Sequence, residues 1–324
     1  MPLQRHAQNP VLQPGDIPAF RPDLVDVSSV FNPGAVMWRG RELLLLRVQT
    51  RGRTTVLIPA ERKADGRFDI QHRVMQVEGF ADFTPQPMHI YDPRLTVIDD
   101  VLHAVMACDF VDGCRLLTAC TDDFENWRMV SLDEHGDRRN GVLFPERIGG
   151  SFMRLERPNS ATRAGAPPTG DAITLATSAD LKTWREVGPV MAGHHGRWDE
   201  LIGSGPPPIK TRDGWLHIYH GVATHFAAAN IYQAGAVLLD LENPARVIAR
   251  GAFNILEPRE IYELTGQVPN VVFPSGIVVQ TVDNEGFAEQ QSTVRVYYGA
   301  ADTVVGMAET TVAELINDAR FQAP

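Results

Sequence analysis

The chain has 324 residues, of which 44% are hydrophobic and 22% charged, and its formal net charge is −10. This length is sufficient for a large hydrophobic core, and the charged fraction is too ordinary for a disordered protein. The acidic balance argues against nucleic acid or an anionic membrane as the main partner.

The first 27 residues are rich in proline and polar side chains, which predicts an N-terminal arm over residues 1–27. They contain no apolar stretch of the kind that a secretory signal peptide needs. Further along, no run of about 18 apolar residues predicts a membrane span. The three cysteines have neither CxxC spacing nor an even count, which disfavours a disulfide framework and a zinc site. We therefore expect a cytoplasmic protein without a metal ion.

From Phe31 to Tyr298, nearly every segment is a short apolar run bounded by Gly, Pro, Asp or Asn, as in an all-β protein. Five hairpins stand out, most of them with a tight turn such as Arg39-Gly40 or Asp213-Gly214. Their second strands cover residues 43–47, 102–107, 152–157, 215–220 and 294–298. A unit that returns at such intervals is typical of a β-propeller, so we predict five blades over residues 28–305.

The end of the chain has a helical pattern. Thr311 and Glu314 have the spacing of a capping box, in which the two residues satisfy each other's backbone N–H groups. Leu315, Ile316 and Ala319 follow at helical spacing. We expect a C-terminal helix within residues 306–324 that packs on the outside of the propeller.

Several second strands end on a residue that can do chemistry. Because a propeller gathers equivalent strands around one axis, Arg47, Arg157 and His220 would meet in one funnel. Arginine binds phosphate or carboxylate through paired N–H groups, and histidine adds a donor. Such a cluster predicts an oxyanion site that fits inorganic phosphate. The alternative is surface pairing with the 40 acidic residues, which is the better interpretation for Arg138 and Arg154.

A second candidate is the tetrapeptide Tyr91-Asp92-Pro93-Arg94, which enters an apolar strand. The proline restricts the backbone and can aim the carboxylate of Asp92. A nearby guanidinium would hold that carboxylate ionised, whereas an apolar wall would raise its pKa. On the tetrapeptide alone, the better interpretation is a structural turn closed by an Asp–Arg pair.

These segments together resemble glycoside hydrolase family 130, which contains β-mannoside phosphorylases and related β-mannosidases built on five-bladed propellers. The resemblance covers about residues 28–305, in the family's order. It rests on VFNPGAV around Asn32, YDPR at 91–94, Arg139-Asn140 with LFPERIGG, Arg157-Pro158, GPPPIKTRDGWLHIYHG at 205–221 and YYGAADT at 297–303.

The resemblance implies inverting phosphorolysis of a β-mannoside to α-mannose 1-phosphate, with phosphate in place of the activated water of a hydrolase. Asp92 occupies the position of the general acid, whose proton is thought to travel through the 3-hydroxyl of the sugar. No cofactor is implied besides inorganic phosphate as co-substrate. The phosphate ligands would be Arg139, Arg157 and His220, and the sugar-binding residues Asn32, Arg47, Tyr91, Arg94 and Asp302.

One departure from the family pattern bears on the reaction. Where many members have Trp-x-x-x-Lys-Ile-Gly, this chain has Trp198-Asp199-Glu200-Leu201-Ile202-Gly203 and lacks the lysine. The loss of one charged hydrogen bond would weaken phosphate binding by about 1–3 kcal/mol.

The missing lysine makes an inverting β-mannosidase the main alternative, with Glu200 or Asp199 as the base that activates water. A hydrolase has no evident use for two arginines and a histidine, so we favour the phosphorylase. A glycosidase acting on another sugar and a non-catalytic sugar-binding propeller remain further hypotheses. The arm and the C-terminal helix offer places for contacts in a homo-oligomer.

Overall fold

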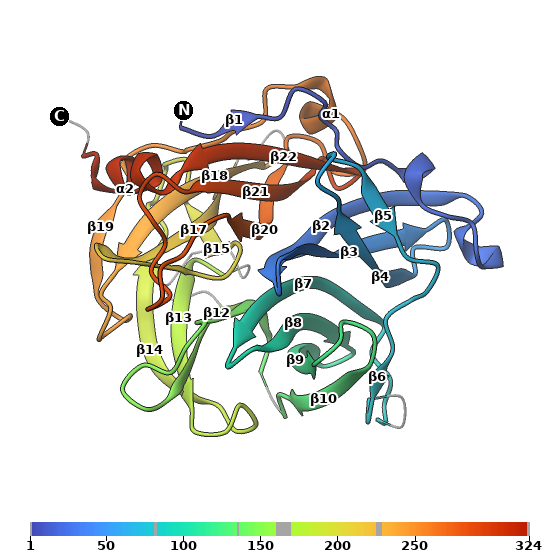
Figure 1. Cartoon of the computed structure of the whole chain (residues 1–324), viewed down its shortest axis with the longest axis horizontal. Helices are drawn as coiled ribbons and strands as arrows, with labels where there is room; N and C mark the ends of the chain where they lie inside the picture. The colour runs from blue at the N-terminus through green and yellow to red at the C-terminus, as the bar shows by residue number, and fades with distance from the viewer. Residues whose placement is uncertain (1, 81–82, 135, 160–169, 225–228, 323–324) are drawn as a thin grey trace.

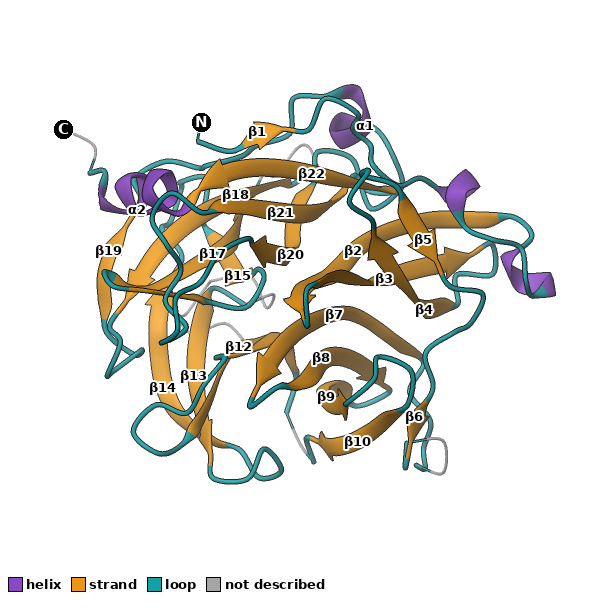
Figure 2. Cartoon of the chain, in the orientation of Figure 1, coloured by secondary structure: helices purple, strands orange, loops and turns teal. Residues whose placement is uncertain are grey.

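The computed structural model describes residues 2–80, 83–134, 136–159, 170–224 and 229–322. In this part of the chain, five mainly antiparallel sheets follow one another around a common centre as the blades of a β-propeller (Figure 1). Strands make up the body and the few helices lie at its periphery (Figure 2). The predicted all-β class, the five blades and the C-terminal helix are confirmed.

Each blade begins with a strand near the centre and continues outward. Blade 1 consists of β2 (Val27–Trp38), β3 (Arg41–Thr50), β4 (Thr55–Arg62) and β5 (Phe68–Ile70). Blade 2 consists of β7 (His89–Ile98), β8 (Val101–Phe110), β9 (Gly113–Thr121), β10 (Trp127–Leu132) and the short outer β6 (Val77–Glu78). Blade 3 consists of β11 (Arg138–Leu143), β12 (Phe152–Pro158), β13 (Ala172–Ser178) and β14 (Arg185–Ala192).

The last two blades carry the chain ends. Blade 4 consists of β15 (Leu201–Ser204), β16 (Ile209–Thr211), β17 (Gly214–Ala223), β18 (Ile231–Leu239) and β19 (Val247–Arg250). Blade 5 consists of β20 (Val272–Val279), β21 (Thr293–Ala300), β22 (Val304–Thr311) and β1 (Gln4–Arg5). The helices are α1 (Ile261–Leu264) and α2 (Val312–Arg320), with 3-10 turns at Pro14–Asp16 and Pro22–Leu24.

The hairpin turns explain why the blades form where they do. All five predicted second strands lie in the second strand of a blade, namely β3, β8, β12, β17 and β21. Asp99 (φ 51°) and Asp100 (φ 60°) join β7 to β8, and Arg39 and Gly40 join β2 to β3 with the same sign of φ. Two-residue loops with positive φ at both positions match the right-handed twist of the strands that they join.

The central strands of blades 1, 2 and 3 share a β-bulge, in which two residues oppose one residue of the next strand. Its first residue is Asn32 (φ 44°), Asp92 (φ 53°) or Asn140 (φ 53°). Asn and Asp are the non-glycine residues that best tolerate this left-handed backbone conformation. A bulge re-aims a side chain, and all three of these side chains reach the cavity described below.

The N-terminal segment closes the ring. β1 pairs antiparallel with β22, so that Gln4 lies opposite Glu309, and Leu12 forms a bridge with Val305. Part of the predicted arm is therefore the outermost strand of blade 5. Residues 306–311, at the start of the segment predicted for the C-terminal helix, belong to β22 because they stay paired with β21. The helix α2 begins at Val312, with Thr311 as its N-cap.

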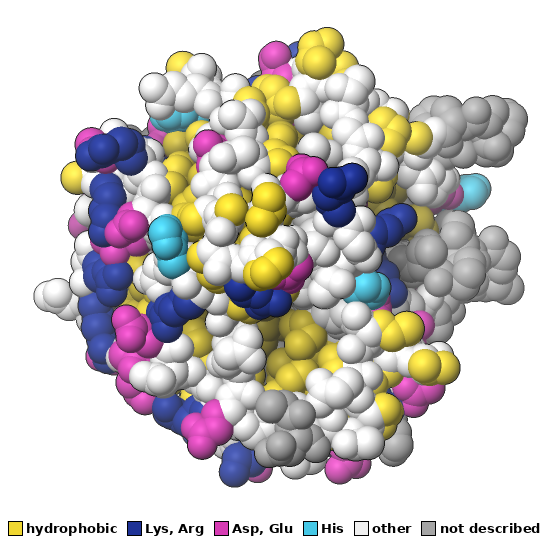
Figure 3. Space-filling view, turned by 90° about the vertical axis from the view of Figure 1, so that its right-hand side faces the viewer, with side chains coloured by type: hydrophobic (Ala, Val, Ile, Leu, Met, Phe, Trp, Pro, Cys, Tyr) yellow, Lys and Arg dark blue, Asp and Glu magenta, His cyan; other side chains and the backbone are white. Residues whose placement is uncertain are grey.

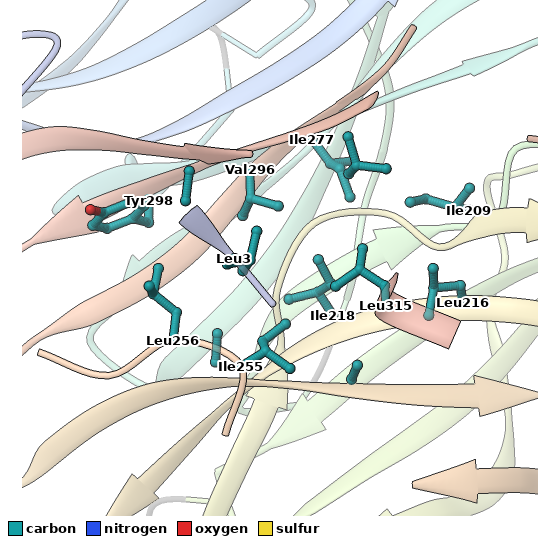
Figure 4. Packing of buried hydrophobic residues seen from close by; sticks show 14 of the residues in the cluster. Leu3, Ile209, Leu216, Ile218, Ile255, Leu256, Ile277, Val296, Tyr298 and Leu315 are labelled. Atoms are coloured by element: carbon teal, nitrogen blue, oxygen red, sulfur yellow. The ribbon is translucent and has the colours of Figure 1, made fainter. Parts of the chain in front are cut away.

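The arm and α2 are anchored in a hydrophobic cluster shared by blades 4 and 5. Leu3 of the arm and Leu315 of α2 point into it beside Ile218 and Val296 (Figure 4). Leu315 is fully buried and Leu3 is 3% exposed. Burial of one leucine side chain contributes about 1.5–3 kcal/mol, so both chain ends stabilise the ring.

The surface is mixed in charge. Basic and acidic side chains alternate along the left edge of the face in Figure 3, which balances charge locally. Within the described ranges, no helix is long and apolar enough to cross a membrane.

Candidate active site

A cavity of about 370 Å³ lies where residues of all five blades and their connections converge. Of the residues proposed from sequence, those that line it are Asn32, Arg47, Tyr91, Asp92, Arg139, Arg157 and Asp302. The propeller thus brings together side chains from positions 32 to 302, as expected for strands that share one axis.

Asp92 is held by two neighbours in the cavity. Its Oδ1 accepts hydrogen bonds from Arg47 Nη1 at 2.7 Å and from Asn32 Nδ2 at 3.0 Å. Burial raises the pKa of the Asp92 carboxyl, but the positive charges of Arg47 and Arg94 outweigh burial and lower this pKa below its ordinary value. The carboxylate is therefore ionised at neutral pH in the empty cavity.

Arg94 lies behind Asp92 instead of lining the cavity. Its side chain is 1% exposed; Nε donates to the carbonyl oxygen of Gly205 at 2.8 Å and Nη1 to that of Asp92 at 2.9 Å. Burial lowers the pKa of this guanidinium to about 10. Arg94 thus fixes the backbone of the bulge, whereas the sequence had placed it among the sugar-binding residues.

Tyr91 and Arg139 share a carboxylate that sequence reasoning missed. Tyr91 Oη donates to Asp109 Oδ1 at 2.8 Å, and Arg139 Nη2 approaches the same oxygen at 3.4 Å. The Arg47 guanidinium lies 4.7 Å from the centre of the Tyr91 ring. Asp109 therefore orients two side chains. One is the Tyr91 ring, which lies beside Arg47, the partner of Asp92, and the other is Arg139.

Arg139 and Arg157 form the basic side of the cavity. They are register partners in β11 and β12, and Arg157 Nη2 donates to Asn159 Oδ1 at 3.0 Å. Burial and the charge of Arg139 both lower the pKa of Arg157. An anion between the two guanidiniums would relieve this repulsion, so the geometry suits phosphate.

His220 is fully buried next to this basic side. Its ring centre lies 4.6 Å from that of Phe273 and 6.1 Å from that of Tyr232, two residues that line the cavity. Burial lowers the pKa of His220 well below its ordinary value, so the ring is neutral. His220 does not itself line the cavity, in contrast to its predicted role as a phosphate ligand.

Gly203 makes room for this histidine. It lies opposite His220 in β15 and β17, and a Cβ at this position would lie 2.5 Å from His220 Cε1 and 2.7 Å from Asn140 Oδ1. Only a residue without a side chain fits here. The neighbouring Leu201 and Ile202, where the family has its lysine, are buried apolar side chains.

Asp302 enters the cavity from the turn between β21 and β22. Burial raises its pKa to about 6; Arg47 opposes this rise and Asp92 adds to it. The cavity therefore holds two carboxyl groups with pKa values shifted in opposite directions. Such a pair is frequent where proton transfer takes place.

The two carboxylates proposed as alternative bases lie elsewhere. Asp199 is 1% exposed, and its Oδ2 accepts hydrogen bonds from Arg250 Nη2 at 2.6 Å and Tyr219 Oη at 3.1 Å. Glu200 bonds to Thr224 and to His195. Neither residue is among those that line the cavity.

Lys210, the nearest lysine in sequence to the missing one, pairs with Glu146 at 2.7 Å on the turn side of its hairpin. Lys210 is not among the residues that line the cavity. Among the described residues, no group of three or more His, Cys, Asp or Glu side chains is placed to hold a metal ion.

Several lining residues had not been singled out from sequence. They are Gln49, Arg53, Thr55, His89, Asp109, Tyr232, Val268, Val271 and Phe273, and Asn140, quoted only as part of a motif, lines the cavity too. Gln49 and Asp109 each lie two residues beyond Arg47 and Ala107, which are equivalent positions of the second strands. Because side chains alternate along a strand, extending those strands by two residues would have found both.

The central cavity of this five-bladed propeller holds a carboxylate together with a pair of arginines, groups that suit acid catalysis and anion binding in a carbohydrate-active enzyme. The family model for glycoside hydrolase family 130, described as β-1,4-mannooligosaccharide phosphorylase, matches residues 2–320. The chain belongs to this family.

Two relatives have assigned activities. The chain is 31% identical over 321 residues to the β-1,4-mannooligosaccharide phosphorylase of Ruminococcus albus, which covers 97% of this chain and 90% of that protein. It is 37% identical over 223 residues to the 1,2-β-oligomannan phosphorylase of a Thermoanaerobacter species, which covers 67% of this chain and 66% of that protein.

Solved structures agree with the fold. The β-1,2-mannobiose phosphorylase of Listeria innocua, in complex with β-1,2-mannobiose, matches with a TM-score of 0.83 at 25% identity, over 98% of this chain and 99% of that chain. A glycosyl hydrolase from Bacteroides ovatus matches with a TM-score of 0.78 at 21% identity, over 95% and 93% of the two chains, and supports the fold alone.

Proposed function

We propose that this enzyme cleaves β-mannosides by inverting phosphorolysis and releases α-mannose 1-phosphate. One observation carries the proposal: the carboxylate of Asp92 and the Arg139–Arg157 pair open into the same cavity. The activities of the relatives support a β-mannoside as the substrate and inorganic phosphate as the co-substrate.

Phosphate binds between Arg139 and Arg157. Both guanidiniums lie in the cavity, and the described structure records for Arg157 a neutral side-chain partner, Asn159. Two N–H forks can grip phosphate oxygens and leave one oxygen free to attack C1 of the sugar. His220 supports this site from behind through Phe273 and Tyr232.

Asp92 donates the proton to the leaving oxygen by way of the sugar's 3-hydroxyl, as the family resemblance implies. The positive charges of Arg47 and Arg94 lower the pKa of Asp92 and favour its ionised form. Phosphate brings negative charge into the cavity, which favours the protonated form of a nearby carboxyl. Binding of the co-substrate therefore prepares the acid, and a chain without phosphate remains poorly active.

The mannosyl group lies between the acid and phosphate sides. Asn32 and Arg47 contact Asp92 there, and Tyr91 and Asp302 complete the wall. Hydroxyl groups of the sugar can accept from Arg47 and donate to Asp302. Sugar binding thus competes with the Arg47–Asp92 contact and helps to release the carboxylate for protonation.

The test is incubation of the purified protein with β-1,2- and β-1,4-mannobiose, with and without inorganic phosphate, followed by product identification by NMR. We expect α-mannose 1-phosphate only when phosphate is present. Asp92→Asn should lower turnover by about 100-fold or more. Asp100→Asn, at an exposed surface pair with Arg39, is the matched control. Free mannose at a rate that does not depend on phosphate would refute phosphorolysis.

A further inference from the structure

A second cavity, of about 530 Å³, lies between blades 2 and 3. One wall is the end of β10 with Ser131 and Asp133, and the other is the face of blade 3 that carries Arg154 and Trp184. None of its described lining residues belongs to the cavity of Asp92. It is therefore a separate site, and the proposed reaction does not use it.

Arg154 is the central residue of this cavity. Its side chain is fully buried; Nη2 lies 2.6 Å from Asp133 Oδ2, and Nε donates to Glu156 Oε1 at 2.8 Å. The guanidinium lies 4.2 Å from the centre of the half-buried Trp184 ring. The sequence interpretation of Arg154 as a surface ion pair is correct about the pairing, but the pair is buried.

Each residue of the Arg154–Asp133 pair has one polar atom without a hydrogen-bond partner in the part of the chain that the structure describes. Arg154 Nη1 and Asp133 Oδ1 are buried and have no hydrogen-bond partner among the described residues. A buried polar atom without a partner costs about 1–3 kcal/mol. The donor and the acceptor belong to two ion-paired residues that both line this cavity, and a ligand can satisfy such a pattern.

The charges of the cavity exclude strongly charged ligands. Arg138 bridges Glu156 at 2.9 Å and Glu186 at 2.5 Å, so acidic groups already neutralise both arginines. A phosphate or carboxylate would meet these carboxylates, and a cation would meet the buried Arg154. An apolar ligand would leave the two unpartnered atoms unsatisfied.

We propose that this cavity binds a neutral saccharide. A sugar hydroxyl both accepts and donates, so one hydroxyl can accept from Arg154 Nη1 while it or its neighbour donates to Asp133 Oδ1. The Trp184 ring supplies an apolar surface for the C–H groups of the sugar. The exposed Lys182 and Thr183 border the opening, where further sugar units extend.

The experiment uses the full chain with Asp92→Asn and without phosphate, so that added saccharides stay intact. β-1,4-Mannohexaose, cellohexaose and inorganic phosphate are titrated separately by calorimetry. Thr183→Trp fills the mouth of the cavity without removing a buried group, and Thr281→Trp, at an exposed turn of blade 5, is its matched control. Trp184→Ala is compared with Phe253→Ala, an exposed aromatic residue elsewhere.

We expect mannohexaose to bind in two events, one in the cavity of Asp92 and one in this second cavity. Thr183→Trp and Trp184→Ala should each weaken the second event by about tenfold or more, and both controls should leave it unchanged. A saccharide isotherm that neither variant alters would overturn the proposal, as would binding of phosphate at the position that Thr183→Trp blocks. If the parent chain with phosphate releases no mannose 1-phosphate while Thr183→Trp still weakens saccharide binding, the proposed function fails and this second site stands.

Discussion

Arg139 and Arg157 lie directly opposite each other in neighbouring antiparallel strands, with both guanidiniums in the same cavity. Like charges at opposite positions of a β-ladder destabilise the sheet. The depressed pKa of Arg157 is a sign of this repulsion, added to the effect of burial. The folded chain therefore carries an unfavourable interaction that a bound anion would turn into a favourable one.

Inorganic phosphate should stabilise the protein through this pair. At a concentration of about ten times Kd, the expected gain in the free energy of unfolding is about 1.4 kcal/mol. This gain corresponds to an increase in Tm of a few degrees, at about 2–4 °C per kcal/mol. Arg157→Ala should abolish the increase, whereas Arg39→Ala, which removes an exposed arginine, should retain it. The measurement is thermal unfolding with phosphate, at ionic strength matched by chloride. An equal increase in all three chains would place phosphate elsewhere.

Gly203→Ala should damage the phosphate side of the cavity. The new methyl group would overlap His220 and Asn140, and neither can move without disturbing the central strands. Overpacking of this kind costs about 1–3 kcal/mol. We expect this loss in urea unfolding together with a higher KM for phosphate. Gly15→Ala, which meets nothing within 4 Å, is the control. Unchanged stability and unchanged KM would show that His220 is not held in place as described.

The titration of the Asp302 carboxyl should make the free energy of unfolding fall as pH rises. Its pKa is about 6 in the folded chain, against an ordinary value of 3.8, so between these values the folded state binds more protons than the unfolded state. The stabilising contribution of the group is complete below the ordinary pKa and is lost as pH rises through about 6.

Asp302→Asn removes this titration. The free energy of unfolding of the variant, minus that of the parent chain, should increase by about 2 kcal/mol as pH rises from about 4.5 to about 7.5. Urea unfolding at both pH values measures the difference. Asp26→Asn, at an exposed carboxylate, is the control variant. A constant difference between Asp302→Asn and the parent chain would contradict the raised pKa.

Arg5 should contribute far more to the free energy of unfolding than an ordinary surface arginine does. It pairs at 2.8 Å with Glu263, whose side chain is fully buried and also accepts from Tyr298 Oη. Arg5→Ala leaves this carboxylate without its cation, which costs about 3 kcal/mol. Arg21→Ala breaks an exposed pair and should cost less than about 1 kcal/mol. Equal losses of stability in urea unfolding would show that β1 does not hold the ring closed.

The blades can be predicted because their signals are local. A two-residue loop needs residues that tolerate positive φ, so Asp99-Asp100 and Arg39-Gly40 mark hairpins without knowledge of the rest of the fold. The extent of β22 is harder to predict. Residues 306–311 form a strand because β21 and β1 pair with them from both sides, and β1 lies about 300 positions away in sequence.

The site is predictable to the extent that it follows strand positions. Arg47 and Arg157 occupy equivalent positions of the second strands, opposite the residue before the bulge, and both reach the cavity. Simple alternation would place Asp92 and Arg94 on one face. The bulge at Asp92 separates them, so that Arg94 supports the acid from behind. Val268 and Val271 come from the long connection between β19 and β20, whose path depends on tertiary contacts.

The pairing of β1 with β22 also determines when, during synthesis of the chain, the ring of blades can close. A ribosome makes Gln4 and Arg5 long before their partners Glu309 and Ala308. Until then the start of the chain has no sheet to join, and blades 1 to 4 form as an open arc. Contacts between such distant positions form slowly because a long loop must close. The finished ring can therefore close only when synthesis has passed residue 311.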